Sequence, residues 1–410
     1  MNKNRLIKNF FSLLSLRGLE FLVPLLTIPY QLRVIGVEKY GLIGFSYSFA
    51  VYFGAIIQYG FGVTATRDVA RRRQDEKAIS VLYSTVLAAS LLLAFAAMII
   101  AALILLVFSN MRNNLSLNLL SLLLVMIQSL FPIWFFQGTE RMKYITYLNM
   151  VSKLLFLVGL LVFVHAPVDY LIIPIINILS SFAVLVGAIL IIHYNFGIRI
   201  VCISWRLIWE CLKSGRHSFV NQFAPNLYNN SVVFILGIVF GGNAVGLYSS
   251  ATRVVDAVSS LGYILSNTFL PYLSRSMDNH IIFRKIMLIV GGFCSMLLFV
   301  MADMIGCFLH PSYGLKIAFL IRMTCFSVFM IFVMLTYGTN YLMLKGGEEQ
   351  TARITLFASI SFFIISLILI PRYGIVGGLI TLVGARSVIA AAIYFVYRRM
   401  AHSLEYDALQ

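Results

Sequence analysis

Long apolar stretches, separated by short polar segments, make up most of this chain. Hydrophobic residues account for 60% of the 410 residues and charged residues for only 11%, well below the roughly 25% charged residues of an ordinary soluble domain. Each stretch is about as long as the ~20 residues that an α-helix needs to cross a bilayer. The sequence therefore predicts an all-α integral membrane protein with about twelve transmembrane helices, near residues 10–31, 41–63, 79–107, 115–137, 144–166, 170–192, 216–240, 244–270, 286–308, 315–344, 354–371 and 374–397.

The net charge of +16 reflects membrane topology rather than binding of nucleic acid. When the predicted spans are threaded with the N-terminus inside, most of the 31 lysines and arginines fall on the cytoplasmic side and few fall outside. This distribution follows the positive-inside rule and predicts that both termini are cytoplasmic. The external connections are short, so we expect any activity to lie within the spans.

A short repeat relates the two halves of the sequence. Gly36-x4-Gly41 joins the first two predicted spans, and Gly241-x4-Gly246 joins the seventh and eighth, half a chain length later. Because six spans per half is an even number, both halves enter the membrane in the same direction. We therefore expect a parallel pseudo-twofold repeat whose axis runs along the membrane normal.

Residues 196–213 are too polar to cross a membrane, and their apolar residues recur with a helical period. This pattern predicts an amphipathic helix on the cytoplasmic surface, and we interpret it as a tether between lobes rather than a partner site. The predicted domains are an N-terminal six-helix lobe at 1–195, the connector at 196–213, a C-terminal six-helix lobe at 214–400 and a cytoplasmic tail at 401–410.

Two charged pairs interrupt apolar spans. Arg17 and Glu20 lie in the first span, and Arg253 and Asp256 lie in the eighth. Each pair is spaced three residues apart, so its members share a helix face. A charge in hydrocarbon costs at least ~2.5–3.5 kcal/mol, so by default it faces the protein interior or a water-filled cavity. Two interpretations stay open: a substrate cavity, or internal salt bridges that lock helix packing.

Three further cations, Lys153, Arg322 and Arg386, and one further carboxylate, Asp303, lie within predicted spans. Intramembrane cations therefore outnumber carboxylates, which indicates an anionic substrate group. Phosphate-like oxygens suit the fork geometry of arginine especially well. The alternative is that each isolated cation pairs with a carbonyl or a carboxylate.

Amide side chains gather at the start of the seventh span, where Gln222, Asn226 and Asn229 share a helix face. Amides offer donors and acceptors without charge, which suits hydroxyl-rich sugars, although packing between helices explains them equally well. The sequence contains no Walker loop, G-x-S-x-G, H-E-x-x-H or clustered Cys/His motif. It therefore predicts no catalytic residue, metal site or bound cofactor.

Four segments resemble the bacterial O-antigen flippases (Wzx) of the polysaccharide transporter family: 34–42 (VIGVEKYGL), 58–68 (QYGFGVTATRD), 134–138 (WFFQG) and 373–378 (YGIVGG). The resemblance implies the MATE-like fold of the multidrug/oligosaccharidyl-lipid/polysaccharide (MOP) exporter superfamily, in which two six-helix lobes face each other across a cavity. It implies a transporter and not an enzyme.

The implied substrate is an undecaprenyl-pyrophosphate-linked oligosaccharide, moved by alternating access from the cytoplasmic to the periplasmic leaflet of the bacterial inner membrane. Coupling to a proton or sodium gradient is implied by the superfamily. The residues then expected in the central cavity are Arg17, Arg253, Lys153, Arg322, Arg386, Gln222, Asn226 and Asn229. Those expected as ion-coupling groups or charge partners are Glu20, Asp256 and Asp303.

Expected partners are the lipid-linked oligosaccharide, membrane lipid and polysaccharide assembly proteins such as a polymerase and a chain-length regulator. One alternative function is an ion-coupled small-molecule exporter of the same fold, which would favour an acidic cavity for cationic drugs. Another is an O-antigen polymerase, which would carry a large periplasmic loop.

Overall fold

The computed structural model describes residues 23–24, 26–273, 277 and 280–407. These residues form helices joined by short connections, with no strand among them. This agrees with the predicted fold class, because only helices satisfy every backbone polar group within a single membrane-crossing segment. Arg17 and Glu20, with most of the first predicted span, lie outside the described residues.

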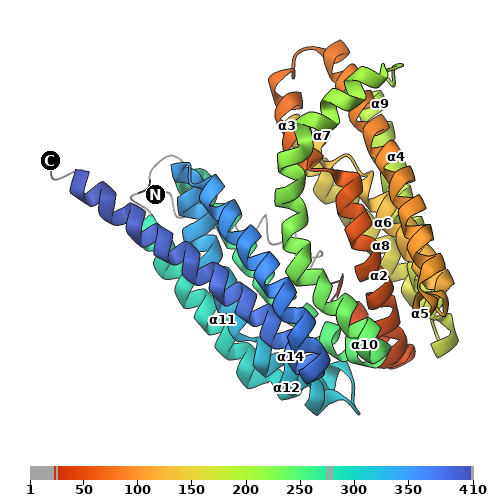
Figure 1. Cartoon of the computed structure of the whole chain (residues 1–410), viewed down its shortest axis with the longest axis vertical. Coiled ribbons are helices and arrows are strands. Elements are labelled where there is room, and N and C mark those ends of the chain that lie inside the picture. Colours follow the sequence, from red (N-terminus) through yellow and green to blue (C-terminus); the bar gives the residue numbers. More distant parts are fainter. Residues whose placement is uncertain (1–22, 25, 274–276, 278–279, 408–410) are drawn as a thin grey trace. The chain divides into compact units, whose positions relative to one another are not determined.

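The chain divides into two compact units, which we call unit 1 (Met1–Gly41 with Leu227–Gln410) and unit 2 (Leu42–Asn226). Their boundaries fall inside α2 (Gly36–Gln58) and α10 (Trp205–Leu273), two helices that run through both units (Figure 1). The division therefore leaves the predicted lobe boundaries at 195 and 213 as predictions.

Unit 2 contains the later part of α2, the earlier part of α10 and the helices between them: α3 (Phe61–Arg71), α4 (Glu76–Val107), α5 (Ser109–Arg112), α6 (Leu115–Ser129), α7 (Ile133–Gly138), α8 (Met142–Phe163), η1 (Pro167–Leu171) and α9 (Ile172–Phe196). Unit 1 contains the rest of α10 and the C-terminal helices: α11 (His280–Leu309), α12 (Gly314–Thr324), α13 (Phe326–Val333), the π-helix η3 (Met334–Leu342), η4 (Met343–Lys345) and α14 (Glu348–Asp407). Within unit 1, α11, α12 and α14 lie side by side (Figure 1).

Nine helices in the described part of the chain are long and apolar enough to cross a membrane. Two of them, Gln222–Leu270 and Glu348–Met400, contain 49 and 53 residues. At 1.5 Å per residue such lengths exceed twice the ~30 Å hydrocarbon core. Each is divided by a glycine with non-helical dihedral angles, Gly241 or Gly374, where the sequence predicts a connection between spans. The total of twelve spans and the cytoplasmic termini remain predictions.

The two glycine motifs of the repeat share one backbone conformation. Gly36 and Gly241 have φ values of 79° and 76°, a left-handed region that costs glycine little. The motifs also meet each other, since a Cβ added to Gly246 would lie 2.1 Å from the Val37 carbonyl oxygen. A Cβ added to Gly41 would clash equally with the backbone of Gly242. Both glycines therefore allow two backbone segments to touch directly.

Between residues 89 and 101 of α4, the buried residues are small, whereas large apolar residues of this helix are exposed. Ala89, Ala94 and Ala101 are at most 1% exposed, whereas Phe95 and Leu106 are more than 60% exposed. This reverses the pattern of a soluble protein, because hydrocarbon solvates large apolar side chains and small ones let helices approach closely.

The connector differs from its predicted form. Residues 197–204 are not helical, and the helix begins only at Trp205. Gly197, at φ 67°, ends α9 in the left-handed conformation. The following backbone is held on α4, where the Ser80 and Ser84 hydroxyls accept hydrogen bonds from the Arg199 and Val201 amides at 3.2 and 3.0 Å. These side-chain bonds replace the intrahelical bonds that an amphipathic helix would make.

Candidate functional site

Two helices of unit 2 are broken within apolar segments. Between α2 and α3, Tyr59 and Gly60 adopt positive φ values of 42° and 76°. A Cβ added to Gly60 would lie 2.6 Å from the Ser218 Cβ of α10, so glycine permits both the turn and the contact. Non-helical backbone at membrane depth is tolerated only where it is buried in protein or lines a cavity.

The second break separates α6 from α7. Pro132 has no backbone N–H and cannot continue a helix, and the Ile133 amide donates to the Phe131 carbonyl at 2.8 Å. The two breaks lie close together across α3 and α7, because the Thr66 hydroxyl, which donates to the Gly62 carbonyl at 2.7 Å, lies 3.3 Å from the Trp134 carbonyl. α3 lies beside α7 (Figure 1), and a Cβ at Gly138 would lie 2.6 Å from the Val69 Cβ.

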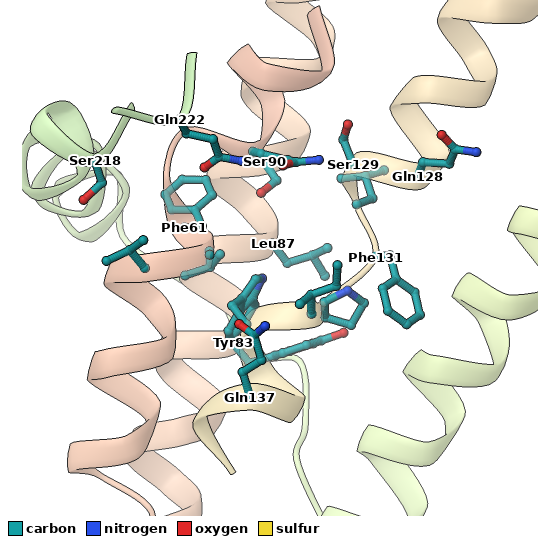
Figure 2. A pocket seen from close by; sticks show the side chains of 18 residues that line it. Phe61, Tyr83, Leu87, Ser90, Gln128, Ser129, Phe131, Gln137, Ser218 and Gln222 are labelled. Carbon is teal, nitrogen blue, oxygen red and sulfur yellow. Dashed lines mark hydrogen bonds between the residues drawn. The ribbon is translucent and has the colours of Figure 1, made fainter. Parts of the chain in front are cut away.

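Two cavities, of about 500 and 290 Å³, lie at these breaks within unit 2. They share Gln58, Gln128, Ser129 and Gln222, so they form one polar region, which we call the amide cavity. Ser90 of α4 and Gln137 of α7 add further polar groups to its larger part. In the view of Figure 2, the cavity runs from Gln222, Ser90 and Ser129 at one end to Tyr83 and Gln137 at the other.

Hydrogen bonds fix the orientation of its amides. The Gln222 Nε2 group donates to the Gln58 Oε1 atom at 2.5 Å, and the Tyr47 hydroxyl donates to the Gln128 Oε1 atom at 3.3 Å. The Thr66 hydroxyl lies 3.4 Å from the Gln137 Oε1 atom. In the described part of the chain, the Nε2 groups of Gln128 and Gln137 have no partner. The Gln128 carbonyl is thus held by Tyr47, while the Nε2 groups of both lining side chains keep their donors for another group.

Aromatic rings form the other wall of the amide cavity. Trp134, Tyr83 and Phe61 line it and are at most 8% exposed. The Tyr83 and Trp134 ring centroids lie 5.7 Å apart, in the 4.5–7 Å range of favourable aromatic pairs. The rings are therefore held by the core and present fixed apolar faces.

An ion pair outside the spans joins the segments that follow α3 and α7. Arg73 Nη2 lies 2.7 Å from Glu140 Oε1 and donates to the Gly138 carbonyl at 3.4 Å. The hydrogen bond from Arg73 lowers the pKa of the Glu140 carboxyl, and the same bond raises the pKa of Arg73. Both side chains are exposed, so the pair orients the loop more than it stabilises the fold.

The charged residues of unit 1 form ion pairs other than the one that helical spacing in the sequence indicates. Arg386, with a side chain only 9% exposed, donates through Nη2 to Asp256 Oδ1 at 2.8 Å. Its Nη1 group donates to the Ser327 hydroxyl at 3.2 Å. Asp256 is thus held by a residue 130 positions away and not by Arg253, its neighbour on the helix face.

Arg253 is exposed, and its guanidinium carbon lies 5.3 Å from the centroid of the Tyr40 ring. Among the described residues, no carboxylate forms a salt bridge with it. Arg322 and Asp303 instead form their own ion pair at 2.5 Å. Among the described residues of unit 1, Arg253 is therefore the one predicted cation that forms no ion pair.

The remaining predicted site residues are dispersed. Gln222 and Asn226 line the amide cavity, whereas Asn229, one turn later on α10, belongs to unit 1 and lines neither part of it. Lys153 lies half-buried on α8 and lines neither part. The sequence reasoning missed Gln58, Gln128 and Gln137, although each is an amide inside a predicted apolar span, the same signal that identified Gln222.

The family model described as "Polysaccharide biosynthesis protein" matches residues 6–277 of the chain. The chain is 24% identical over 408 residues to a protein of Escherichia coli (strain K12) named "Putative O-antigen transporter", covering 97% of this chain and 98% of that one. A protein of Shigella dysenteriae with the same name is 23% identical over 268 residues, covering 65% and 67% of the two chains.

Solved structures of similar fold are transporters and a flippase. The lipid II flippase MurJ, in an inward closed conformation, superposes with a TM-score of 0.76 at 12% identity, covering 95% of this chain and 87% of that one. An inward-facing MATE family transporter of the MOP superfamily superposes with a TM-score of 0.73 at 15% identity, covering 94% and 96%. These likenesses confirm the predicted MOP fold.

The curated relatives are named as transporters, and the described part of the chain holds nine helices long and apolar enough to cross a membrane. The family model covers well over half of the sequence. This chain is therefore a multi-pass membrane protein that belongs to the polysaccharide biosynthesis protein family.

Proposed function

We propose that this protein is a flippase that moves undecaprenyl-pyrophosphate-linked O-antigen repeat units from the cytoplasmic to the periplasmic leaflet of the bacterial inner membrane. Alternating access of its two halves exposes the substrate site to each side in turn. The flipped unit then passes to a polymerase and a chain-length regulator. The similarity, over 97% of this chain, to a protein named "Putative O-antigen transporter" supports the substrate class.

The environment of Arg253 is the main support for this proposal. It lies within an apolar span, is exposed, and has a ring contact with Tyr40 in place of a carboxylate partner in the described part of the chain. Such a position is costly in hydrocarbon and is a functional-site hypothesis by default. An arginine fork donates two parallel hydrogen bonds to phosphate oxygens, so Arg253 suits the pyrophosphate of a lipid-linked sugar.

Arg386 has a different role in this proposal. Its charge is already matched by Asp256, so it positions that carboxylate rather than binding the substrate. We assign ion coupling to Asp256, which is 54% exposed and accessible to a proton or a sodium ion. Competition between the ion and Arg386 for this carboxylate then biases the conformation of unit 1, because a ligand shifts an equilibrium only through its differential affinity for the two states.

Two other functions explain the observations less well. A small-molecule exporter for cationic drugs would favour acidic side chains, and within the described residues no carboxylate lines the amide cavity. A polymerase would need a large periplasmic loop, and the longest connection between the described spans, 197–221, lies mostly in the connector that the sequence predicts to be cytoplasmic.

Complementation of a flippase-null strain tests the proposal. The wild-type protein should restore surface O-antigen, and Arg253→Ala should reduce it at least about tenfold at matched membrane expression, with partial recovery in Arg253→Lys because lysine keeps the charge and loses the fork. Arg206→Ala, which removes an exposed arginine outside the spans, is the matched control. Restored drug resistance without surface polysaccharide would refute the proposal, and full activity of Arg253→Ala would refute the assigned site.

A further inference from the structure

The residues that line the amide cavity have no role in the function proposed above. Its polar groups are amides and hydroxyls, and within the described residues no lysine, arginine, aspartate or glutamate lines it. Its residues come from six helices of unit 2 (α2, α3, α4, α6, α7 and α10). Residues far apart in the sequence gather here, beside two helix breaks.

The amides are arranged to bind groups that both donate and accept hydrogen bonds. Each primary amide carries two donors and one carbonyl acceptor. A hydrogen bond from Tyr47 holds the Gln128 carbonyl, and the Nε2 donors of Gln128 and Gln137 have no partner among the described residues. Ser90 and Ser129 add hydroxyls that rotate to donate or accept. An occupant that left these donors without a partner would cost free energy, so such a cavity favours a polyhydroxylated occupant.

The aromatic wall completes the match to a sugar. Trp134, Tyr83 and Phe61 supply fixed apolar faces, and a pyranose ring carries an apolar C–H face as well as hydroxyls at its rim. The larger cavity, about 500 Å³, lies within the ~300–1,000 Å³ typical of small-molecule sites. Mostly apolar walls with a few placed polar groups are also typical of such sites.

We propose that the amide cavity of unit 2 is a binding subsite for an uncharged, hydroxyl-rich sugar ring, and that it selects neutral sugars over acidic ones. Gln128 and Gln137 donate to ring hydroxyls, the Gln58–Gln222 pair bounds the site, and Trp134 packs against the apolar face of the ring. The inference rests on the proposed function, since the ring belongs to the transported lipid-linked oligosaccharide.

The selectivity follows from charge. A uronic acid would bring a carboxylate into a cavity that has no lining cation among the described residues, and an unpaired buried charge is costly. A lipid chain would leave the glutamine donors without partners, which is also unfavourable. A neutral sugar is the occupant that satisfies both the amides and the rings.

Tryptophan fluorescence tests the inference directly. The chain has three tryptophans, and only Trp134 lines the cavity, while Trp205 and Trp209 are more than 60% exposed at the start of α10. A Trp205→Phe/Trp209→Phe variant therefore reports on the cavity alone. Purified in detergent, it is titrated with the methyl glycosides of glucose, galactose and N-acetylglucosamine and with methyl glucuronide.

We expect at least one neutral glycoside to change the Trp134 emission saturably, and methyl glucuronide to bind at least about tenfold more weakly. Gln128→Leu and Gln137→Leu, each made in that background, should each weaken binding about tenfold, because each removes a hydrogen bond and changes side-chain volume little. Gln350→Leu, at an exposed residue of α14, is the matched control. Melting temperatures confirm that each variant is folded.

Equal binding of neutral and acidic glycosides, no response to any neutral glycoside, or unchanged affinity in folded glutamine variants would each overturn the inference. The same variants in the flippase-null strain separate it from the proposed function. If the wild-type protein fails to restore surface polysaccharide, the function fails, whereas the titration still reports on the cavity. If the wild type restores polysaccharide and both glutamine variants transport and bind as it does, the subsite alone fails.

Discussion

Replacing Asp256 by asparagine should destabilise unit 1 by about 2–3 kcal/mol, because it leaves the Arg386 charge buried without a counterion. The two side chains are 2.8 Å apart and are 9% and 54% exposed for Arg386 and Asp256. Coulomb attraction at this distance is ~6 kcal/mol at an effective dielectric constant of ~20 and ~1.5 kcal/mol in water. The half-exposed carboxylate places the pair between these limits, below the ~3–5 kcal/mol cost of breaking a fully buried pair.

Replacing Arg386 instead of Asp256 should reduce the free energy of unfolding by less. Arg386→Met removes the buried cation and leaves a carboxylate that is half exposed, so we expect a loss of about 1 kcal/mol. The double variant should be more stable than Asp256→Asn alone, because replacing both partners of a buried pair is often close to neutral. The cycle should therefore give a coupling energy of about 2 kcal/mol, within the range for side chains in contact.

Thermal melting in detergent measures all three variants. For a unit of this size, 1 kcal/mol corresponds to about 2–4 °C, so Asp256→Asn should melt about 5–10 °C lower than the wild type. Glu349→Gln breaks the exposed Arg353–Glu349 pair and serves as the control, with an expected effect below about 1 kcal/mol. A double variant that melts no higher than Asp256→Asn would refute the reasoning.

Three further predictions concern other parts of the chain. Gly246→Ala should lower the melting temperature and the yield, because its Cβ would clash with the Val37 carbonyl oxygen. Gly292→Ala is the control, because a Cβ at this position would have no neighbouring atom within 4 Å. Equal melting temperatures of the two variants would contradict the close approach at Gly246. At pH 8, a maleimide should label the exposed Cys202 before Cys211. Burial raises the pKa of the Cys211 thiol to about 11, so only about 0.1% of this thiol is thiolate at that pH. Equal labelling rates of the two cysteines, measured by mass spectrometry, would be inconsistent with this burial. Because Arg73 lowers the pKa of Glu140, their ion pair contributes stability at neutral pH that disappears as the pH falls below about 4. The difference in melting temperature between wild type and Glu140→Gln should therefore shrink on acidification and in high salt. A difference that grew on acidification would contradict the predicted direction of the pKa shift.

The helical fold and most connections between spans were predictable because they depend on local properties. A run of apolar residues must be helical in hydrocarbon, since its backbone groups have no other partners there. Gly36, Gly241 and Gly374 mark connections because their positive φ values favour glycine wherever they occur. The form of the connector was not predictable from its amphipathic pattern, because Ser80 and Ser84 of another helix hold residues 199 and 201.

The charge partners required the tertiary structure. Helical spacing places Arg253 and Asp256 on one face, but spacing identifies only neighbours on the same helix. Arg386 reaches Asp256 from α14, and Arg322 of α12 reaches Asp303 of α11. A buried charge pairs with whichever opposite charge the packing brings closest, and sequence separation has no part in that choice.

The sequence by itself determined a helical membrane protein with a repeated glycine motif and a few costly polar side chains, because bilayer thickness and backbone hydrogen bonding act on each segment separately. Only the tertiary structure decided which of these side chains work together. Gln58, Gln128, Gln137 and Gln222 come from four helices and meet at two helix breaks, whereas Arg386 is neutralised by Asp256. Which amides share a cavity depends on long-range packing, which no local pattern encodes.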